Sequence, residues 1–304
     1  MYQSIFVIIL NWNNYTDTRE CIESLQKSDY PLARIVVIDN GSHDDSIVRL
    51  LNDYSLNRKV DVICNESNYG FARGVNVGIR YALEHGAEFV LLVNNDAVVD
   101  RTCVKQLMVI TETNNKVGIV GPRVLQHTDR RKICGYGYYY NRFKTSVTCP
   151  EHNKLVKDCP PHTREVEALA GCIMLVRKKV FEEIGFFDEQ YFFYDEDVDF
   201  CLRASRAGFK IIYIPAAKAW HKLASVIQER TSPFVLYHRA RSRIIFLGKN
   251  FSWLHLLWGL LLHLTLYTPF RCFQVFRGSK SWKSIWAWFR GSLAGIQELL
   301  WHTS

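Results

Sequence analysis

Four carboxylates crowd into five positions in the middle of the chain, directly after an aromatic run. Residues 191–194 read Tyr-Phe-Phe-Tyr, and the acids that follow are Asp195, Glu196, Asp197 and Asp199. Acidic side chains favour the positive end of a helix macrodipole, so a helix N-terminus explains one or two of these acids but not all four. The pattern indicates a pocket with aromatic walls and a reactive carboxylate at its floor.

One of these acids has the chemistry of a general base. A carboxylate can take the proton of an attacking hydroxyl group, and neighbouring carboxylates raise one another's pKa, which suits a base near neutral pH. We assign this role to Asp197, with Glu196 orienting the base or the acceptor. Asp195 and Asp199 are candidates for acceptor contacts or helix capping, and Tyr194 for the wall of the acceptor site.

Polar residues also follow two apolar segments of strand length. Asp39 follows residues 35–38, where it can accept from a nucleobase N–H or a ribose hydroxyl, or simply satisfy its own turn. Residues 94–96, Asn-Asn-Asp, follow residues 88–93. Asp96 is placed to bind a divalent cation that bridges a diphosphate, because such cations take oxygen ligands from a few carboxylates and from phosphates. A strand-end turn is the alternative.

A later pair of residues offers one more metal ligand. Trp220 and His221 follow a predicted strand and Pro215. His221 is a candidate to complete the metal site or to hold the diphosphate, with a surface histidine as the alternative. Trp220 is a candidate for acceptor binding.

Glycines recur every four residues at positions 70, 74 and 78, so they share one face of a predicted helix. Glycine on that face permits close approach of a ligand or of another backbone. Arg73, near the start of the helix, can contact a base or a diphosphate. Tight packing of the helix on a sheet is the alternative, and it is compatible with function. The spacing is not G-x-G-x-x-G, so a dinucleotide-binding turn is not supported.

The elements that must position these residues alternate along the chain. Apolar runs of strand length lie at residues 4–10, 35–38, 60–64 and 88–93, and helical patterns lie at residues 16–28, 43–54 and 70–84. This alternation predicts an α/β fold with a mostly parallel central sheet flanked by helices on both faces. The polar residues above would then meet at the carboxyl edge of the sheet, where open α/β sheets bind ligands.

The second half of the chain is less regular. Residues 121–164 are rich in Tyr, Cys, Pro and His, and predict an insertion or irregular strands. Regular patterns return with a strand at 168–176 and a short helix from Arg177. A helix at 198–207, ended by Gly208, and a strand at 210–214 follow.

The C-terminal segment differs in charge and hydropathy from the rest. From residue 238 onward there are nine basic residues and one acid, so this tail carries the whole net charge of +8. Residues 251–270 lack formal charge and are long enough to span a bilayer, although His255, Gly259 and His263 form a weakly polar stripe. Residues 282–301 have the pattern of a Trp-rich interfacial helix with basic flanks. We expect a catalytic domain at 1–249 and a membrane-associating helical extension at 250–304; packing of both helices on the catalytic domain is the alternative.

The nine cysteines follow no disulfide framework, which favours a reducing compartment, and no secretory signal is visible. Two C-x-x-H pairs, with Cys134 nearby, have the ligand types of a structural zinc site. The pairs are Cys149 with His152 and Cys159 with His162. An ordinary loop is the alternative.

Taken together, these blocks resemble the family 2 glycosyltransferases with the GT-A fold, and their bacterial rhamnosyltransferase-type subgroup. The resemblance extends from about residue 5 to residue 249. Five blocks carry it in the family's order: residues 9–13, 37–42, 68–78, 93–96 and 185–203. Each block alone is weak, and the ordered set is specific.

The resemblance implies inverting transfer from a nucleoside-diphosphate sugar, aided by Mg²⁺ or Mn²⁺. Asp39 matches the family's base-recognition carboxylate, Asp96 the last acid of the D-x-D motif, and Asp197 the catalytic base. Asn94 stands at the first position of that motif, so one charged ligand is missing, and His221 is a candidate to compensate. The nucleotide-sugar site would further comprise Asn11, Asn68, Gly70, Arg73 and Asn95.

By the same resemblance, the first choice of donor is dTDP-rhamnose and the second a UDP-sugar. The acceptor would be a lipid-linked or polysaccharide hydroxyl in cell-surface glycan synthesis. The enzyme would then be cytoplasmic and peripheral on the inner face of the cell membrane. The rival functions are a nucleotidyltransferase and a non-catalytic sugar-binding module. Nucleic acid is not an expected partner, because the aromatic residues of the tail pattern as an amphipathic helix and not as a stacking platform.

Overall fold

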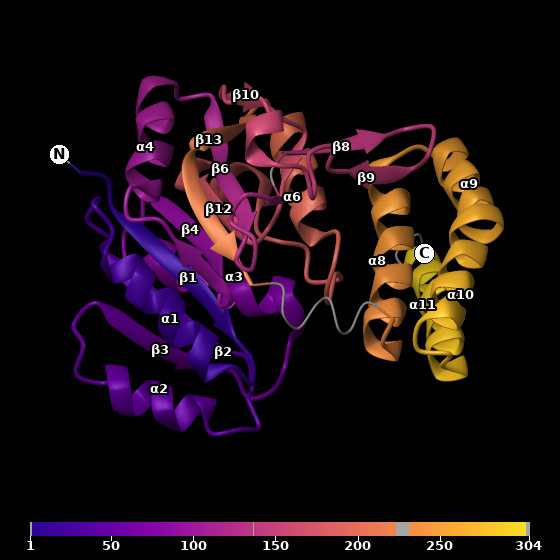
Figure 1. The fold of residues 1–304 in the computed structure, drawn as a ribbon, viewed down its shortest axis with the longest axis horizontal. Coiled ribbons are helices and arrows are strands. Elements are labelled where there is room, and N and C mark those ends of the chain that lie inside the picture. Colours follow the sequence, from indigo (N-terminus) through magenta and orange to yellow (C-terminus); the bar gives the residue numbers. More distant parts are fainter. Residues whose placement is uncertain (1, 136, 223–230, 302–304) are drawn as a thin grey trace.

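The N-terminal part of the protein alternates strand and helix as predicted. The computed structural model describes residues 2–135, 137–222 and 231–301 (Figure 1). The first elements are β1 (Ile5–Asn11), α1 (Tyr15–Gln26), β2 (Arg34–Asp39), α2 (Ser46–Tyr54), β3 (Val60–Cys64), α3 (Gly70–Glu84) and β4 (Phe89–Asn94). β1 pairs in parallel with β2 and β4, and β2 pairs in parallel with β3.

The middle of the chain completes the sheet. Its main elements are β5 (Ala97–Val99), α4 (Cys103–Thr113), β6 (Val117–Gln126), β12 (Ile173–Arg177), α5 (Lys178–Ile184), α6 (Glu196–Arg206) and β13 (Lys210–His221). Short strands lie between them: β7 (Ile133–Gly135), β8 (Gly137–Asn141), β9 (Ser146–Thr148), β10 (Arg164–Glu165) and β11 (Ala168–Leu169). The strand order is β10-β13-β6-β12-β4-β1-β2-β3. β6 and β13 are parallel to each other, and β12 runs antiparallel between β6 and β4.

Helices cover both faces of the sheet, because the inner strands are apolar on both sides. On β1, Phe6 and Ile8 pack with α3, α5 and α6 on one face. Ile5, Val7 and Ile9 pack with α1, α2 and α4 on the other face. The prediction of a mostly parallel sheet between two helical layers is confirmed.

The glycine face of α3 lies against the sheet. A Cβ at Gly74 would stand 2.7 Å from Leu10 Cδ1, and one at Gly78 would stand 2.6 Å from Ile8 Cγ2. These two glycines therefore serve tight helix–sheet packing, which is the alternative considered above.

Two predicted strands differ from the structure. Residues 168–176 are not one strand, because the chain turns at Gly171 and β11 pairs with β8 while β12 joins the main sheet. The strand predicted at 210–214 continues to His221. After a register shift between Ile214 and Lys218 it pairs again with β6 and also with β5. Neither long-range pairing is visible in the local pattern of apolar residues.

The C-terminal helices form a separate layer beside the sheet domain (Figure 1). They are α8 (Pro233–Asn250), α9 (Trp253–Leu262), a π-helical turn (His263–Tyr267), α10 (Thr268–Arg277) and α11 (Trp282–Trp301). Close contact joins α8 to α11, since a Cβ at Gly291 would lie 2.1 Å from the Tyr237 carbonyl oxygen. No helix within the described residues is long and apolar enough to cross a membrane.

The weakly polar stripe of residues 255–263 faces the protein. His263 Nε2 lies 2.8 Å from Ser292 Oγ on α11, and a Cβ at Gly259 would touch Leu247 on α8. His255 Nε2 lies 2.8 Å from the Tyr140 hydroxyl on β8. The helices thus present their polar side inward and their apolar side outward.

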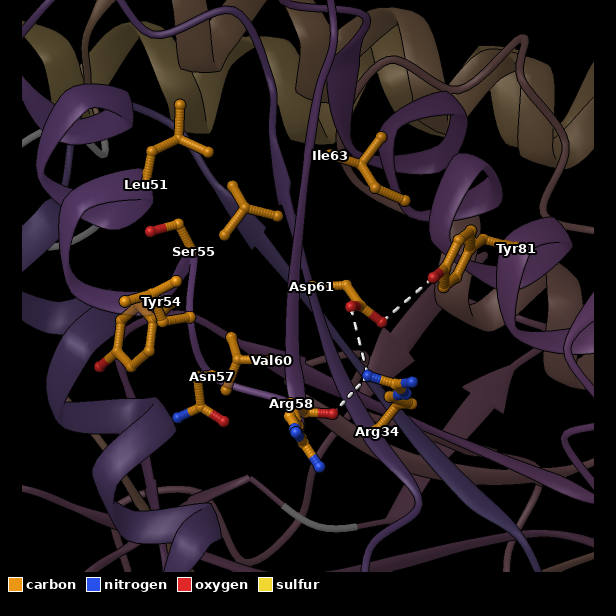
Figure 2. A pocket seen from close by; sticks show the side chains of 12 residues that line it. Arg34, Leu51, Tyr54, Ser55, Asn57, Arg58, Val60, Asp61, Ile63 and Tyr81 are labelled. Carbon is orange, nitrogen blue, oxygen red and sulfur yellow. Dashed lines mark hydrogen bonds and ion pairs between the residues drawn. The ribbon is translucent and has the colours of Figure 1, made fainter.

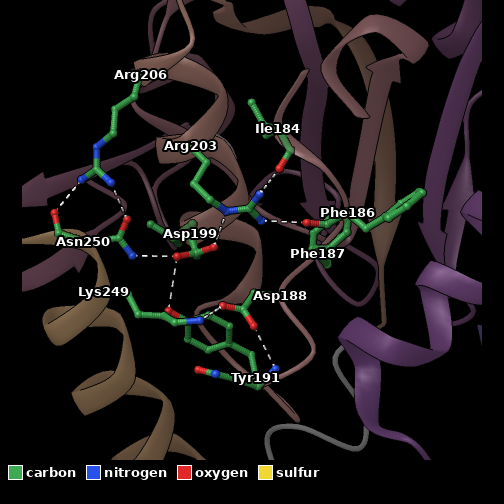
Figure 3. A network of polar contacts seen from close by, with 12 residues as sticks. Ile184, Phe186, Phe187, Asp188, Tyr191, Asp199, Arg203, Arg206, Lys249 and Asn250 are labelled. Atoms are coloured by element: carbon green, nitrogen blue, oxygen red, sulfur yellow. Dashed lines mark hydrogen bonds and ion pairs between the residues drawn. The ribbon is translucent and has the colours of Figure 1, made fainter. Parts of the chain in front are cut away.

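A buried polar network fastens α8 to α6 (Figure 3). Asp199, 3% exposed, accepts hydrogen bonds from Arg203 Nε at 2.8 Å and from Asn250 Nδ2 at 2.7 Å. Arg206, also on α6, donates hydrogen bonds to the side-chain oxygen and to the backbone carbonyl of Asn250, which ends α8. Asp199 was a candidate for acceptor contact or helix capping. In the structure it instead holds α6 and α8 together.

Candidate active site

A cavity of about 390 Å³ opens at the carboxyl ends of β1 and β4. It lies where the strand order predicts a ligand site for an open α/β sheet. Its walls come from both halves of the chain and include the following predicted site residues: Asn68, Gly70, Asn95, Asp96, Tyr194 and His221. Residues from four segments that are distant in sequence therefore meet around one space.

Asp96 and His221 form a pair on the wall of this cavity. The tight turn after β4 presents Asp96, and the pairing of β13 with β5 places His221 opposite Ala97. Asp96 Oδ1 lies 2.8 Å from His221 Nε2, and Cys134 Sγ lies 3.8 Å from His221 Nδ1. Burial lowers the pKa of His221, but the contacts with Asp96 and Cys134 outweigh that effect and raise it to about 10.

The pair fits a divalent cation that also binds a diphosphate. Mg²⁺ and Mn²⁺ are commonly held by one or two protein ligands, with waters and substrate phosphates completing the shell. Asp96 offers a carboxylate, and His221 offers Nε2 once the cation has displaced the proton that this nitrogen shares with Asp96; both residues line the cavity. Within the described residues, no three His, Cys, Asp or Glu side chains gather as a complete ligand set. The phosphates of a substrate would have to supply the remaining ligands.

A network of amides shapes the side of the cavity next to α3. Asn40 Nδ2 donates to Asn68 Oδ1 at 3.0 Å and to the Gly70 carbonyl at 3.1 Å. Gly70 has a φ of +79°, and a Cβ there would lie 2.6 Å from the Phe192 carbonyl oxygen. That same carbonyl accepts the Phe71 N–H at 2.7 Å. Gly70 is thus required for the close approach of the aromatic–acid loop to the start of α3.

Asp39 and Asn11 lie behind the lining of the cavity, at the ends of β2 and β1. Asp39 is 2% exposed and accepts from Asn11 Nδ2 at 2.7 Å, from the Ser42 hydroxyl at 2.6 Å and from the Ser42 N–H at 3.0 Å. Asn11 is fully buried and also accepts from Thr18. The carboxylate therefore supports its own turn, and base recognition by Asp39 stays a prediction.

Arg73 and Trp220 do not line the cavity. Arg73 lies over the Tyr69 ring, 4.1 Å from its centroid, and its Nε is 3.9 Å from Glu189. Trp220 alternates with His221 along β13, and its ring lies under Arg130. Both side chains would have to move to touch a ligand in the cavity.

The acid cluster begins α6 in a strained conformation. Tyr194 and Asp195 have φ values of +73° and +67°. Such backbone costs roughly 1–3 kcal/mol per residue and persists only where neighbouring contacts enforce it. One such contact is the hydrogen bond from the Ser242 hydroxyl to the Phe193 carbonyl at 2.8 Å. Strain at the junction of the aromatic wall and the acids is typical of a functional site.

Asp197 is held by backbone donors. The Gly171 N–H donates to Asp197 Oδ2 at 2.7 Å, and the Val198 N–H donates to Oδ1 at 2.8 Å. The turn at Gly171, which interrupts the predicted strand, is what brings this donor to the acid cluster. Burial raises the pKa of Asp197, and these backbone hydrogen bonds partly oppose the rise.

Glu196 is the more deeply buried member of the pair. It is 6% exposed, and its Oε2 has no hydrogen-bond partner. Burial and the charge of Asp197 raise the pKa of Glu196 well above its ordinary value. Of the two side chains, half-buried Asp197 is the one better placed to receive a proton from a substrate.

One buried residue, Cys172, is influenced by both the metal pair and the acid cluster. Burial raises the pKa of Cys172, and the charges of both Asp96 and Asp197 contribute to the rise. The carbonyl of the same residue accepts the N–H of Asn94 at 2.8 Å. Gly171, the preceding residue, donates to Asp197, so this turn connects the candidate base with the end of β4, two residues before Asp96.

Sequence reasoning missed part of the wall. Phe234 and Val235 of α8 line the cavity, although α8 was considered only for its basic residues. Asn40 lines it too, and its position after the apolar strand was the available signal. The sequence contained no comparable signal for α8, because its approach to the site is purely tertiary.

Two other candidate sites carry no support. The cysteine and histidine pairs of residues 149–162 lie within the described residues, where no metal-binding group forms, so the structure favours the ordinary loop over a zinc site.

A hollow of about 510 Å³ at the β3 edge is lined by Arg34, Asp61 and Tyr81 (Figure 2). Arg34 begins β2 and Val60 begins β3, so this hollow lies at the amino ends of the strands, away from the candidate site.

Comparison with known proteins agrees with this geometry. The model of "Glycosyltransferase like family 2" matches residues 3–245. The chain is 26% identical over 258 residues to a low-salt glycan biosynthesis hexosyltransferase of Haloferax volcanii, covering 83% of this chain and 78% of that protein. It is 28% identical over 263 residues to a dTDP-rhamnosyl transferase of Shigella flexneri, covering 82% of each.

Solved structures share the fold. A mannosyltransferase from Pyrobaculum calidifontis in complex with GDP-Man and Mn²⁺ aligns with a TM-score of 0.60 at 15% identity, over 100% of this chain and 89% of that one. S. aureus TarS 1-349 in complex with UDP-GlcNAc aligns with a TM-score of 0.61 at 18% identity, over 98% and 82%. The chain belongs to the family 2 glycosyltransferases, is similar to their rhamnosyltransferases, and has the GT-A fold.

Proposed function

We propose that the protein is an inverting, metal-assisted glycosyltransferase. The donor is a nucleoside-diphosphate sugar, with dTDP-rhamnose as the first choice and a UDP-sugar as the second. The acceptor is a hydroxyl of a lipid-linked or polysaccharide glycan in cell-surface glycan synthesis. The observation that carries the proposal is that the turn at Gly171 and Cys172 joins the two candidate groups. Its Gly171 N–H holds Asp197, and its Cys172 carbonyl binds Asn94, two residues before Asp96.

The relatives support the choice of donor and acceptor. One relative is named a dTDP-rhamnosyl transferase. Another, from Mycobacterium tuberculosis, is named an N-acetylglucosaminyl-diphospho-decaprenol L-rhamnosyltransferase and is 39% identical over 93 residues, 30% of each chain.

Asp96 and His221 would hold Mg²⁺ or Mn²⁺ against the donor diphosphate. A bound ion of this kind neutralises negative charge that develops on the leaving diphosphate. Asn40, Asn68 and the start of α3 shape the adjoining wall, where the nucleotide would lie. Tyr194, with Phe192 and Phe193, would exclude water on the acceptor side.

Asp197 would take the proton of the acceptor hydroxyl while its oxygen attacks the anomeric carbon. The new glycosidic bond forms as the bond to the diphosphate breaks on the opposite side, so the anomeric configuration inverts. Two backbone N–H donors fix the orientation of the Asp197 carboxylate, which leaves its remaining lone pairs for the hydroxyl. Glu196 would support this geometry from its buried position.

The C-terminal helices would place the enzyme on the inner face of the cell membrane, as the extension expected at residues 250–304 after a catalytic domain at 1–249. Large apolar side chains remain exposed along α9, the π-helical turn, α10 and α11, among them Trp253, Leu257, Leu261, Leu264, Phe273, Phe276, Trp282, Trp286 and Trp301. Lys283 and Arg290 flank Trp286 and suit anionic headgroups. Flotation with anionic liposomes tests this: wild type should float, a Trp282→Ser/Trp286→Ser variant should float less, and an unbound wild type contradicts the proposal.

A donor screen tests the proposed chemistry. Thermal shift with Mn²⁺ should select dTDP-rhamnose over UDP-sugars and free nucleoside triphosphates, and NMR of the transfer product should show an inverted anomeric centre. Release of inorganic diphosphate from a nucleoside triphosphate would instead identify a nucleotidyltransferase. Donor binding with neither transfer nor hydrolysis, across lipid-linked and free acceptors, would identify a sugar-binding module.

A further inference from the structure

Two arginines one turn apart on α8 lie beside the acid cluster. The guanidinium of Arg239 stacks on the Tyr194 ring, 4.5 Å from its centroid, and Tyr194 is part of the cavity wall. Arg243 Nη2 donates to Thr145 Oγ1 at 2.7 Å, and its guanidinium lies 4.0 Å from the centre of the Tyr267 ring. The two cations thus lie where the catalytic domain meets the C-terminal helices.

The positive charge of the two arginines is only partly balanced, by one carboxylate. Among the described residues, Arg239 makes no hydrogen bond or ion pair, and its contact is the ring of Tyr194. The buried Nε of Arg243 has no partner, and burial lowers the pKa of Arg243. The carboxylate that interacts with both is Asp195, whose own pKa burial and Asp197 raise to about 6. Buried donors without partners are costly, so an anionic ligand would complete this group.

The arginines also lie close to the exposed apolar surface. Tyr267, which Arg243 contacts, ends the π-helical turn that carries Leu264 and Leu266. The latter two side chains are 62% and 52% exposed. A ligand with its sugar in the cavity and its lipid on this surface would therefore have its linking group next to the arginines.

We propose that Arg239 and Arg243 form a binding site for the phosphate or diphosphate that links sugar to lipid in the acceptor. A planar guanidinium group can donate two parallel hydrogen bonds to two oxygens of one phosphate. It thereby neutralises the charge of the phosphate and fixes its orientation. Tyr194 then lies between the anion site and the cavity that receives the sugar. This inference rests on the proposed transferase function, because it assigns the acceptor side of the same cavity.

Farnesyl diphosphate is a suitable probe, and farnesol is its uncharged match. Isothermal titration of the full chain in EDTA, without metal, should show at least about tenfold tighter binding of farnesyl diphosphate than of farnesol. Arg239→Gln and Arg243→Gln should each weaken the binding of farnesyl diphosphate by about tenfold and leave the affinity for farnesol unchanged. Lys105→Gln, which removes one exposed positive charge from α4, should change neither. Turnover is not needed, so a chain without transferase activity would still give this result.

Three outcomes would overturn the proposal. The first is equal affinity for farnesyl diphosphate and farnesol, and the second is unchanged affinity in both arginine variants. The third is loss of dTDP or UDP binding with Mn²⁺ in these variants, which would show that the pair holds the donor diphosphate. Arg243 is largely buried, so circular dichroism should accompany its variant. Arg239→Gln removes the contact with the Tyr194 ring and one charge near Asp195, but no hydrogen bond or ion pair, so it carries the test if the Arg243 variant fails to fold.

Discussion

Replacement of Asp197 by Asn should abolish transfer while leaving donor binding nearly intact. A positioned general base contributes about 10²- to 10⁴-fold to a rate, or roughly 3–5 kcal/mol of the barrier. The asparagine side chain would keep the size and one acceptor oxygen of the aspartate but could not take a proton. We therefore expect kcat to fall at least about 100-fold and the Kd of the donor with Mn²⁺ to stay within about twofold.

The same substitution has a separate effect on folding. Asp197 accepts from both the Gly171 and Val198 N–H groups. The amide of an asparagine can accept only one of these, and its NH₂ group would face the other donor. The loss of one buried hydrogen bond costs about 1–3 kcal/mol of unfolding free energy, so urea denaturation must show that the variant is folded at the assay temperature.

Glu196→Gln is the matched control. The pKa of Glu196 is raised well above its ordinary value, and an amide resembles the protonated acid, so stability should change little. Activity should fall by less than about tenfold, since a positioning residue contributes less than the base it supports. Because burial raises the pKa of Asp197, the acid limb of the kcat/KM profile should lie above the pH at which an exposed Asp titrates. Activity should be lost as pH falls through that pKa, because the base becomes protonated.

The assay is release of the nucleoside diphosphate, with donor affinity measured by titration calorimetry. Substantial turnover in Asp197→Asn would refute the assignment of the base. Loss of activity in Glu196→Gln, with activity kept in Asp197→Asn, would reverse the two roles. If both variants kept wild-type rates, no side chain of this pair would act as a base.

Three further predictions concern the metal, the network and the helix contact. Asp96→Ala should weaken donor binding at least about tenfold in Mn²⁺ but not in EDTA, because it removes the carboxylate ligand; equal calorimetric titrations of wild type and variant in Mn²⁺ would count against this. Asp199→Ala should lower the unfolding free energy by about 3–5 kcal/mol, measured by urea denaturation, because Arg203 would stay partly buried without its carboxylate; a loss under about 1 kcal/mol would contradict this. Gly291→Val should destabilise the chain and separate α11 from α8, and an unchanged melting temperature would show that the contact with Tyr237 relaxes freely.

Local pattern was sufficient for the N-terminal half of the fold. The strand at residues 60–64 and the helix at 70–84 were predicted with the observed bounds. Parallel strands place their carboxyl ends at one edge, so the convergence of strand-end residues such as Asn95 and Asp96 followed from the alternation alone. The roles assigned to individual side chains remain predictions for the variants above.

Position after a strand did not decide which side chains reach the cavity. Asp39 and Asn11 hydrogen-bond to each other behind the lining, and Arg73 lies over Tyr69. Strand-end position defines an edge of the sheet, but the local turn and its hydrogen bonds decide whether a side chain faces the ligand or its own backbone.

The sequence by itself determined the order of the elements, the family resemblance, and the division between a neutral body and a cationic, Trp-rich tail. Only the tertiary structure decided that His221 meets Asp96 across 125 positions, that the chain turns at Gly171 to hold Asp197, and that α8 brings its arginines to the acid cluster. The physical reason is that periodicity reports which face of an element is buried. Partners that are distant in sequence are chosen by strand pairing and side-chain packing, and these leave no local pattern.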